Sequence, residues 1–471
     1  MEEEHLDHIH ILAVPFFLKG HEIPLLHLSR HLHSLTGGRI AVTILQLPQN
    51  KSPPSGGAPP SQPEKGLEFV RYEDLPLERP AERNVKLFLE FFLKFKALGG
   101  AVAARWRHRR VTCVISDVLV GWGGDVARDL GVPWVAFWTS TMTELAVYSN
   151  LPRLISENAI KDLETVVKIP GLADLKVLDY MTLHHATDPK FSADIVGKTF
   201  VEAVGYSSQA DRVLANSSHT LEGNAVRALE LCGINIVPVG PLHLNISTGS
   251  DPDDPNQVIP WLDKQESRSV LYIAFGTIAP VPAAQFEQIA LALESTKNIA
   301  FLLVVRPQQL ELVPKEFGAT ARYALKSGGA LEHVNGGTVY RGLLTDWAPQ
   351  VAVLGHRAVG GFLTHCGWNS ILESVTVGVP VMSMPRMADQ CLTRKILDEE
   401  WGISVRLGNA ITDVVSKADL EAAIQELMFK RRDELGKKAS DLGELARQGM
   451  EEGGSSRSGI DSLVKDLELW K

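Results

Sequence analysis

The stretch of sequence that decides the fold is Trp347–Gln390, which reads WAPQVAVLGHRAVGGFLTHCGWNSILESVTVGVPVMSMPRMADQ. Within it, the apolar run Gly360–Thr364 predicts a buried strand that ends in a glycine-containing turn, His365–Trp368. Asn369 or Ser370 is then expected to cap a helix. A strand, a glycine turn and a helix in this order aim backbone N–H groups and a positive helix end at whatever binds above the turn. Phosphate is the natural ligand of such a unit.

Side chains in the same stretch add chemistry to this unit. His365, Asn369 and Ser370 could donate further hydrogen bonds to a phosphate. Glu373 follows about one helical turn later, where a carboxylate can accept hydrogen bonds from two ribose hydroxyls. Trp347 offers a flat face on which a base can stack. A capped helix after a strand is nevertheless common, and a tryptophan is more often a core residue than a ligand platform.

Strand and helix patterns repeat on both sides of this stretch. In the second half, strands are expected at Ser269–Phe275, Ile299–Val305, Val379–Met382 and Ile403–Arg406, and a helix at Pro282–Leu293. In the first half, strands are expected at His8–Phe16, Ile40–Leu45, Val111–Ser116 and Trp134–Phe137, with a helix that starts at Pro24. Alternation of this kind predicts the α/β class, with parallel sheets covered by helices. The polar, Pro-rich segment Thr248–Pro260 predicts a linker between two halves, with a ligand-binding cleft between them.

Length and composition restrict the class of protein. The chain has 471 residues, of which 45% are hydrophobic and 22% charged, as expected for two soluble domains. A net charge of -9 argues against a general nucleic-acid binder, which needs basic faces. The acidic start, Met1–His5, is unlike a signal peptide, and no run approaches the ~20 apolar residues that span a bilayer. We therefore expect a cytoplasmic protein with reduced thiols at its four scattered cysteines, Cys113, Cys232, Cys366 and Cys391.

The first half contains a candidate acid–base pair. His21 lies in a short turn, Lys19–His21, expected between the first strand and the first helix. An imidazole with a pKa near ~6.5 suits a general base at neutral pH. Asp117 follows a strand and could stabilise the imidazolium of His21. Most of the 15 histidines must be surface or packing residues, and Asp125 is a competing carboxylate, expected to make a surface or capping contact inside the next helix.

The stretch Trp347–Gln390 resembles the signature box of plant UDP-glycosyltransferases, which glycosylate secondary metabolites and hormones. It has the full length of that box, begins with WAPQ, ends with DQ and carries HCGWNS, LES and GVP at the expected offsets. Further segments resemble the family in the expected order, namely Pro15-Phe16, Gly20-His21, Ile169–Gly171, Val239–Pro241, Trp261–Asp263, Phe275–Thr277 and Gly453–Ser456. The resemblance therefore covers nearly the whole chain.

The resemblance implies a GT-B fold of two Rossmann-like parallel-sheet domains. Residues 1–247 would bind the acceptor, 248–260 would be the linker, 261–450 would bind the UDP-sugar, and 451–471 would form a C-terminal helix that packs back on the first domain. His21 and Asp117 match the positions of the family's catalytic dyad. The positions implied for UDP binding are Thr277, Trp347, Ala348, Gln350, His365, Asn369, Ser370 and Glu373. The positions implied for sugar binding are Trp368, Asp389 and Gln390.

The implied reaction is an inverting, metal-independent transfer of glucose from UDP-glucose to a hydroxyl of a small lipophilic acceptor, such as a flavonoid or another phenol. Gln390 at the end of the box resembles members that use glucose. The Asp251–Asp254 run is interpreted as solvated linker charge rather than as a metal site. We expect no cofactor, because UDP-glucose is a co-substrate. The expected partners are the UDP-sugar and the acceptor alone, with the protein a monomer that spans no membrane.

Three alternatives to this reaction remain open. The first is C-glycosylation of a phenol ring, the second a UDP-amino-sugar epimerase and the third a non-catalytic UDP-sugar sensor. The signature box argues against the epimerase, and His21 with Asp117 argues against the sensor.

The acceptor cannot be read from the sequence. Aromatic residues of the expected helix Ala81–Leu98 suggest an apolar, planar guest, although core packing explains them as well. The segment Val147–Leu183 is a further candidate for acceptor contacts. Departures from the family pattern occur at Ala274, at Pro385–Ala388, at Thr393 and in Ala319–Gly337, which is interpreted as a flexible insertion.

Overall fold

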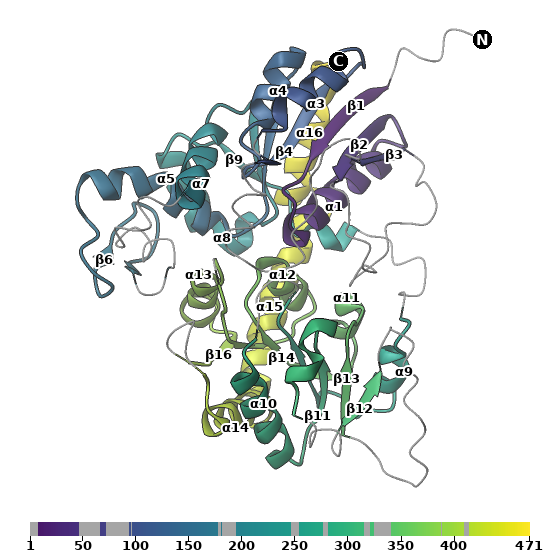
Figure 1. Ribbon diagram of the computed structural model, residues 1–471, viewed down its shortest axis with the longest axis vertical. Helices are drawn as coiled ribbons and strands as arrows, with labels where there is room; N and C mark the ends of the chain where they lie inside the picture. The colour runs from purple at the N-terminus through teal and green to yellow at the C-terminus, as the bar shows by residue number, and fades with distance from the viewer. Residues whose placement is uncertain are drawn as a thin grey trace. The chain divides into compact units, whose positions relative to one another are not determined.

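The computed structural model of the chain divides into two compact units. It describes residues 8–46, 66–71, 94–95, 97–177, 180, 195–245, 254–276, 281–314, 321–324, 341–387, 389–408 and 414–471. Unit 1 comprises residues 1–53, 59–247 and 446–471, and unit 2 comprises residues 54–58 and 248–445. Each unit contains a parallel sheet with helices packed along it (Figure 1).

Unit 1 is built on a seven-stranded sheet in the order β3-β2-β1-β4-β5-β8-β9. The strands are β1 (Ile9–Val14), β2 (Ile40–Gln46), β3 (Leu67–Arg71), β4 (Cys113–Asp117), β5 (Trp134–Trp138), β8 (Arg212–Ala215) and β9 (Ile236–Pro238). All neighbouring pairs are parallel. Because β2 and β4 lie on opposite sides of β1, the order reverses between β1 and β4. Such a switch point is where open α/β sheets bind ligands.

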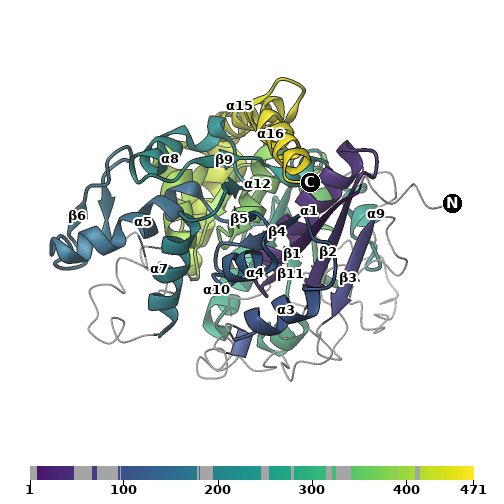
Figure 2. The same ribbon diagram turned by 90° about the horizontal axis from the view of Figure 1, so that it is seen from above.

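Helices cover both faces of this sheet. They are α1 (Lys19–Leu35), α3 (Gly99–Trp106), α4 (Gly123–Leu130), α5 (Met142–Ser156), α7 (Ile195–Ser207), α8 (His219–Leu231), η3 (Leu242–Asn245) and α16 (Ser455–Leu469), beside a small hairpin of β6 (Val166–Val167) and β7 (Leu175–Lys176). Alternate residues of β1 enter opposite cores, since Leu12 belongs to the cluster of Trp106 and Ile11 to that of Leu28 and Ile460. The C-terminal helix α16 thus completes unit 1, where it packs beside β9 (Figure 2).

Unit 2 also contains a seven-stranded parallel sheet, in the order β12-β13-β11-β10-β14-β15-β16. The strands are β10 (Val270–Ala274), β11 (Ala300–Val304), β12 (Ala321–Ala324), β13 (Gly342–Thr345), β14 (Val359–Thr364), β15 (Val381–Ser383) and β16 (Ser404–Arg406). The helices include α9 (Val258–Leu262), α10 (Ala283–Ser295), α11 (Gln350–Leu354), α12 (Trp368–Thr376), α13 (Gln390–Lys395), α14 (Lys417–Gln425) and α15 (Arg432–Met450), which runs into unit 1. Here the strand order reverses between β10 and β14.

Three local expectations are wrong. The first helix does not begin at Pro24 but at Lys19, so the expected turn Lys19–His21 is its first turn. Proline fixes φ near a helical value and removes one hydrogen bond, which this helix tolerates close to its N-terminus. Asp254 is not a solvated charge, because its carboxylate accepts hydrogen bonds from the backbone N–H groups of Val258 and Ile259 at 2.9 and 2.8 Å. Within the supposed flexible insertion, Ala321–Ala324 forms strand β12, which pairs with β13.

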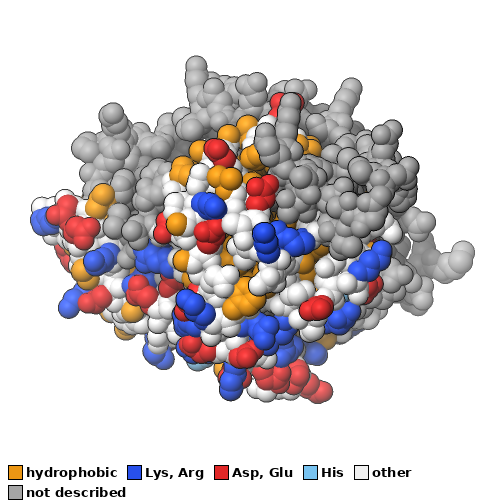
Figure 3. Space-filling view, turned by 90° about the horizontal axis from the view of Figure 1, so that it is seen from below, with side chains coloured by type: hydrophobic (Ala, Val, Ile, Leu, Met, Phe, Trp, Pro, Cys, Tyr) orange, Lys and Arg blue, Asp and Glu red, His pale blue; other side chains and the backbone are white. Residues whose placement is uncertain are grey.

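Several expectations fall on residues that the structure does not describe. They include Thr277, most of the expected helix Ala81–Leu98, Asp251–Asp253 and Ala388. Among the described helices, none has the length and apolar character needed to cross a bilayer. On the face shown in Figure 3, the described Lys and Arg side chains are interspersed with Asp and Glu side chains.

Candidate active site

A buried carboxylate and an imidazole meet at the switch point of unit 1. His21 lies in the first turn of α1, directly after β1, and Asp117 is the last residue of β4. His21 Nδ1 lies 2.8 Å from Asp117 Oδ2, and the side chains are 19% and 1% exposed. The other carboxylate oxygen, Oδ1, accepts a hydrogen bond from the backbone N–H of Leu119 at 2.8 Å. A neutral imidazole paired in this way carries its proton on Nδ1, which leaves the lone pair of a general base on Nε2.

Thr139 completes this pair and was not foreseen from the sequence. Its hydroxyl lies 2.8 Å from His21 Nδ1 and 3.4 Å from Asp117 Oδ2. Thr139 directly follows β5, the strand next to β4. The sequence therefore contained a signal for this contact, namely the position of Thr139 just after an expected strand. The carboxyl ends of neighbouring parallel strands meet at one edge of a sheet. The ring of Phe16 packs edge-on against His21 with centroids 5.1 Å apart, so the imidazole is held from a second side.

The competing carboxylate Asp125 behaves as expected. Its side chain is 60% exposed and pairs with Arg128 one turn along α4, at 2.8 Å between Oδ1 and Nη1. It is therefore a surface residue and lies outside the site.

In unit 2, the turn between β14 and α12 differs from the prediction in one respect. Neither Asn369 nor Ser370 caps the helix, because α12 starts at Trp368 and its N-cap is Gly367, without a side-chain cap hydrogen bond. Cys366 adopts a left-handed conformation with φ 65°, and the N-cap Gly367 lies two residues before Asn369. Asn369 and Ser370 therefore lie in the first turn, where backbone N–H groups have no partner within the helix and suit an anion.

His365 is enclosed by two glycines, Gly367 of this turn and Gly276 after β10. A Cβ atom at Gly276 would lie 2.6 Å from His365 Nε2, and one at Gly367 would lie 2.5 Å from it. Burial lowers the pKa of His365 to about 4, so the ring is neutral at pH 7. Its Nδ1 atom is buried and has no hydrogen-bond partner among the described residues. A buried polar atom in that state is suited to a ligand.

Three residues predicted to bind UDP form a hydrogen-bonded group. Gln350 is the first residue of α11, and its Nε2 donates to Ser370 Oγ at 2.9 Å and to Glu373 Oε2 at 2.7 Å. Burial raises the pKa of Glu373 to about 7, while the hydrogen bond from Gln350 opposes that rise. Trp347 and Ala348 lie before Pro349, the N-cap of α11, and are half-buried.

Asn256 anchors the residues before α11 and was also not foreseen. Its Nδ2 lies 2.8 Å from Thr345 Oγ1, 2.9 Å from Asp346 Oδ1 and 2.9 Å from the backbone oxygen of Trp347. Asn256 is 6% exposed, although it lies in the segment expected to be a polar linker. The local sequence carries no signal for this contact, because its partners lie about ninety positions away.

The residues predicted to bind the sugar are held by their own neighbours. Gln390 Oε1 accepts hydrogen bonds from the backbone N–H groups of Arg386 and Met387 at 2.8 and 2.9 Å, so its Nε2 is the group left to donate. Trp368 is 3% exposed and its ring packs against Trp401, with centroids 6.0 Å apart. Its indole is therefore a core group, and its backbone belongs to the first turn of α12. Asp389 is the N-cap residue of α13. Sugar contact by these residues stays a prediction.

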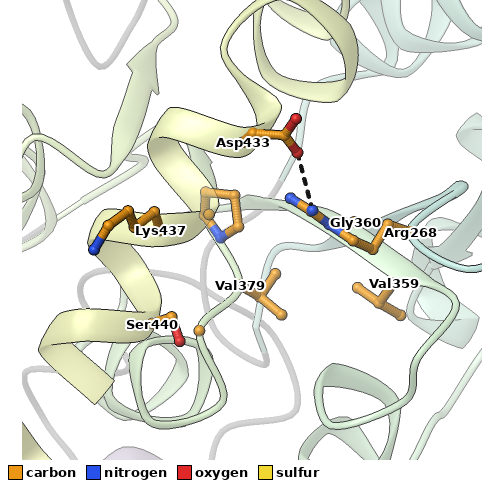
Figure 4. A pocket seen from close by; sticks show the side chains of 10 residues that line it. Arg268, Val359, Gly360, Val379, Asp433, Lys437 and Ser440 are labelled. Carbon is orange, nitrogen blue, oxygen red and sulfur yellow. Dashed lines mark hydrogen bonds and ion pairs between the residues drawn. The ribbon is translucent and has the colours of Figure 1, made fainter. Parts of the chain in front are cut away.

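A pocket of about 370 Å³ lies in unit 2 at the amino ends of the strands, away from the candidate donor-binding residues (Figure 4). It is lined by Val359 at the start of β14 and by Pro380 just before β15, and thus lies at the amino ends of the strands. Its Arg268 is paired with Asp433 at 3.0 Å. The pocket is separate from the group at the carboxyl ends. Among the described residues, no three His, Cys, Asp or Glu side chains are placed to hold a metal ion.

The chain is similar in sequence and in structure to known proteins. Residues 245–439 match the family model described as UDP-glucoronosyl and UDP-glucosyl transferase. The chain is 30% identical to flavonol 3-O-glucosyltransferase F3GT2 of Actinidia chinensis var. chinensis over 98% of this chain and 97% of that protein. It is 35% identical to anthocyanidin 5,3-O-glucosyltransferase of a Rosa hybrid cultivar over 74% and 72%. The structure of Phytolacca americana UGT2 complexed with UDP-2fluoro-glucose and pterostilbene is similar with a TM-score of 0.78, 25% identity and coverage of 98% and 100%.

Proposed function

The chain belongs to the plant UDP-glycosyltransferases and has their GT-B fold, and from this premise we propose that it transfers glucose from UDP-glucose to a hydroxyl of a small phenolic acceptor, with inversion and without a metal ion. Transfer of a sugar from a UDP-sugar to an acceptor is the activity of the family. The pairing of His21 with Asp117 at 2.8 Å is the observation that carries the proposed chemistry.

His21 acts as the general base. Its Nε2 takes the proton of the acceptor hydroxyl as that oxygen attacks the anomeric carbon, and UDP leaves from the opposite face. Asp117, fixed by the backbone of Leu119, stabilises the imidazolium that forms. A single displacement of this kind inverts the configuration at the anomeric carbon.

Unit 2 supplies the donor-binding groups. The first turn of α12 with Asn369 and Ser370, together with neutral His365, binds the diphosphate and stabilises the charge that it gains as it leaves. These groups take the place of a metal ion in the proposed mechanism. Glu373 accepts hydrogen bonds from the ribose, and Trp347 stacks on the uracil. Thr277, Ala348 and Gln350 complete the proposed UDP contacts, and Trp368, Asp389 and Gln390 the sugar contacts.

The choice of glucose and of a phenolic acceptor is supported by the relatives. The two proteins compared above are named as glucosyltransferases of a flavonol and of anthocyanidins. The similar solved structure holds a fluorinated UDP-glucose analogue and pterostilbene. Gln390 agrees with this choice as the residue that ends the signature box.

The test is an assay of purified protein with UDP-glucose and a panel of phenols, in which UDP release and product mass are followed with and without a chelator. We expect acceptor-dependent UDP release and a product heavier by one hexose, unchanged by the chelator. His21→Ala should lower kcat/KM by about a hundredfold to ten-thousandfold and leave UDP binding intact. UDP-glucose binding without a product from any acceptor would contradict the proposal and favour a sensor.

A further inference from the structure

Tyr272 is a buried tyrosine in the middle of strand β10. It is 1% exposed, and its strand neighbours Leu271 and Ile273 belong to the core on the opposite face of the sheet. Its ring stacks on Phe362 of β14, with centroids 4.8 Å apart and an interplanar angle of 17°. A phenylalanine would serve this packing equally well. Burial of the phenol oxygen costs free energy unless it is hydrogen-bonded, so the hydroxyl requires its own explanation.

The hydroxyl of Tyr272 forms a hydrogen bond with the side chain of Gln350. It lies 3.1 Å from Gln350 Oε1, to which it donates. Because the carbonyl side of the amide points at Tyr272, the amide nitrogen points at Ser370 and Glu373. A reversed amide would place its carbonyl oxygen against the carboxylate oxygen of Glu373. The hydrogen bond from β10 therefore selects the amide orientation that serves α12.

We propose that Tyr272 is a positioning residue of the donor site, whose hydroxyl orients the Gln350 amide so that Gln350 holds Ser370 and Glu373 ready for the diphosphate and the ribose. This inference rests on the UDP-binding role proposed above for Gln350 and Glu373. Tyr272 itself lies in the sheet beneath the site and acts through Gln350.

The electrostatics of the group agree with this role. Burial raises the pKa of Tyr272 far above its usual range, and the charge of Glu373 adds to the rise, so the hydroxyl stays a donor at working pH. The pKa of Glu373 is raised to about 7 by burial and lowered by the bond from Gln350. The charge of Glu373 acts on Tyr272 from α12, and α11 presents the neutral Gln350 to both side chains. Loss of the Gln350 bond should therefore raise the pKa of Glu373 further.

The test is Tyr272→Phe, which keeps the ring and removes the hydroxyl. UDP affinity is measured by titration calorimetry between about pH 5.5 and 8.5, around the pKa expected for Glu373. In the wild type, affinity should rise with pH through about 7, because the ribose hydroxyls need a carboxylate as acceptor. The variant should bind UDP about three- to tenfold more weakly at neutral pH, as expected for one hydrogen bond. The midpoint of its pH profile should move upward, and KM for the donor should change more than kcat.

Two further variants separate positioning from packing. Phe362→Leu removes the stacked ring but leaves the hydroxyl, so it should lower the melting temperature without moving the midpoint. Gln350→Met removes the amide and should move the midpoint upward as Tyr272→Phe does. Adding Tyr272→Phe to Gln350→Met should have no further effect on UDP affinity, because the two changes break one chain of contacts.

The outcomes are distinct. A wild type that binds no UDP at any pH would overturn the proposed donor site, on which this inference depends. A wild type that binds UDP, with Tyr272→Phe unchanged or weakened equally at every pH, would overturn the positioning role alone. If Tyr272→Phe does not fold, an unmoved midpoint in Gln350→Met still overturns it.

Discussion

A histidine lies beside the switch point of the sheet in each unit, and the surroundings of the two histidines differ. His21 follows β1 and His365 follows β14, each beside the switch point of its sheet. His21 is paired with a buried carboxylate at 2.8 Å. His365 is enclosed by Gly276 and Gly367, and burial lowers its pKa to about 4. An imidazole beside the switch point is thus suited to taking a proton in one unit and to binding as a neutral group in the other.

Part of the difference originates at the end of the neighbouring strand. In unit 1, β4 ends in Asp117, whose charge favours an imidazolium. In unit 2, β10 is followed by Phe275, which belongs to the hydrophobic core, and by Gly276, which lies against the ring of His365, and neither residue carries a charge. A carboxylate at the end of the neighbouring strand in unit 1, and burial in unit 2, therefore suit the two histidines to different chemistry.

The largest expected effect is that of removing the charge in unit 1. Asp117→Asn keeps the shape of the side chain but removes the stabilisation of the imidazolium. We expect kcat/KM to fall by at least about a hundredfold, while UDP affinity measured by calorimetry stays the same. The matched control is Asp125→Asn, an exposed carboxylate on α4, which should change activity less than twofold or so. Equal activity in wild type and Asp117→Asn would remove the proposed distinction between the two histidines.

The next effect tests the glycine enclosure of His365. Gly276→Ala places a methyl group 2.6 Å from His365 Nε2 at a residue with φ +67°, so the imidazole must shift. UDP affinity should fall by about tenfold or more, equivalent to about 1.4 kcal/mol.

Gly131→Ala is the control for backbone strain alone. Gly131 has φ +68° but open space around its Cβ position, so this variant should lose about 1–2 kcal/mol of stability and no UDP affinity. Similar UDP affinities for the two alanine variants would show that the enclosure has no role in binding.

The last prediction concerns stability in acid and leaves activity aside. His365 has a folded-state pKa of about 4 against an ordinary value of 6.5, so the unfolded chain takes up a proton in this interval before the folded chain does. The free energy of unfolding should therefore fall as pH decreases from 6.5 towards 4. His365→Gln should reduce this fall by on the order of 1–3 kcal/mol, as measured by urea denaturation across that range.

His27 and His243 keep part of the slope in that variant, because burial also lowers their pKa values, to about 3 and about 4. An exposed histidine on α8, His219, is the control, and His219→Gln should leave the slope as in the wild type. An unaltered slope in His365→Gln would mean that His365 is protonated as easily in the folded protein as in the unfolded chain.

Much of the fold followed from local patterns. The strand Gly360–Thr364 and the turn after it were placed within a residue of β14, because an apolar run between glycine turns has few other structures open to it. The helix starts were less accurate, at Pro24 and at Asn369 or Ser370, because a left-handed Cys366 and a tolerated proline are decided by the surrounding structure rather than by propensity.

The sequence by itself determined the two-fold repetition of a strand–helix pattern, the composition of the turn at His365–Trp368 and the residues of the candidate acid–base pair. Tertiary structure alone decided that Thr139 joins His21, that Asn256 supports Trp347 and that Tyr272 reaches Gln350. These partners lie 118, 91 and 78 positions apart. Periodicity reports which face of its own element a residue occupies, whereas a hydrogen bond between distant side chains depends on strand order and packing, which no local pattern encodes.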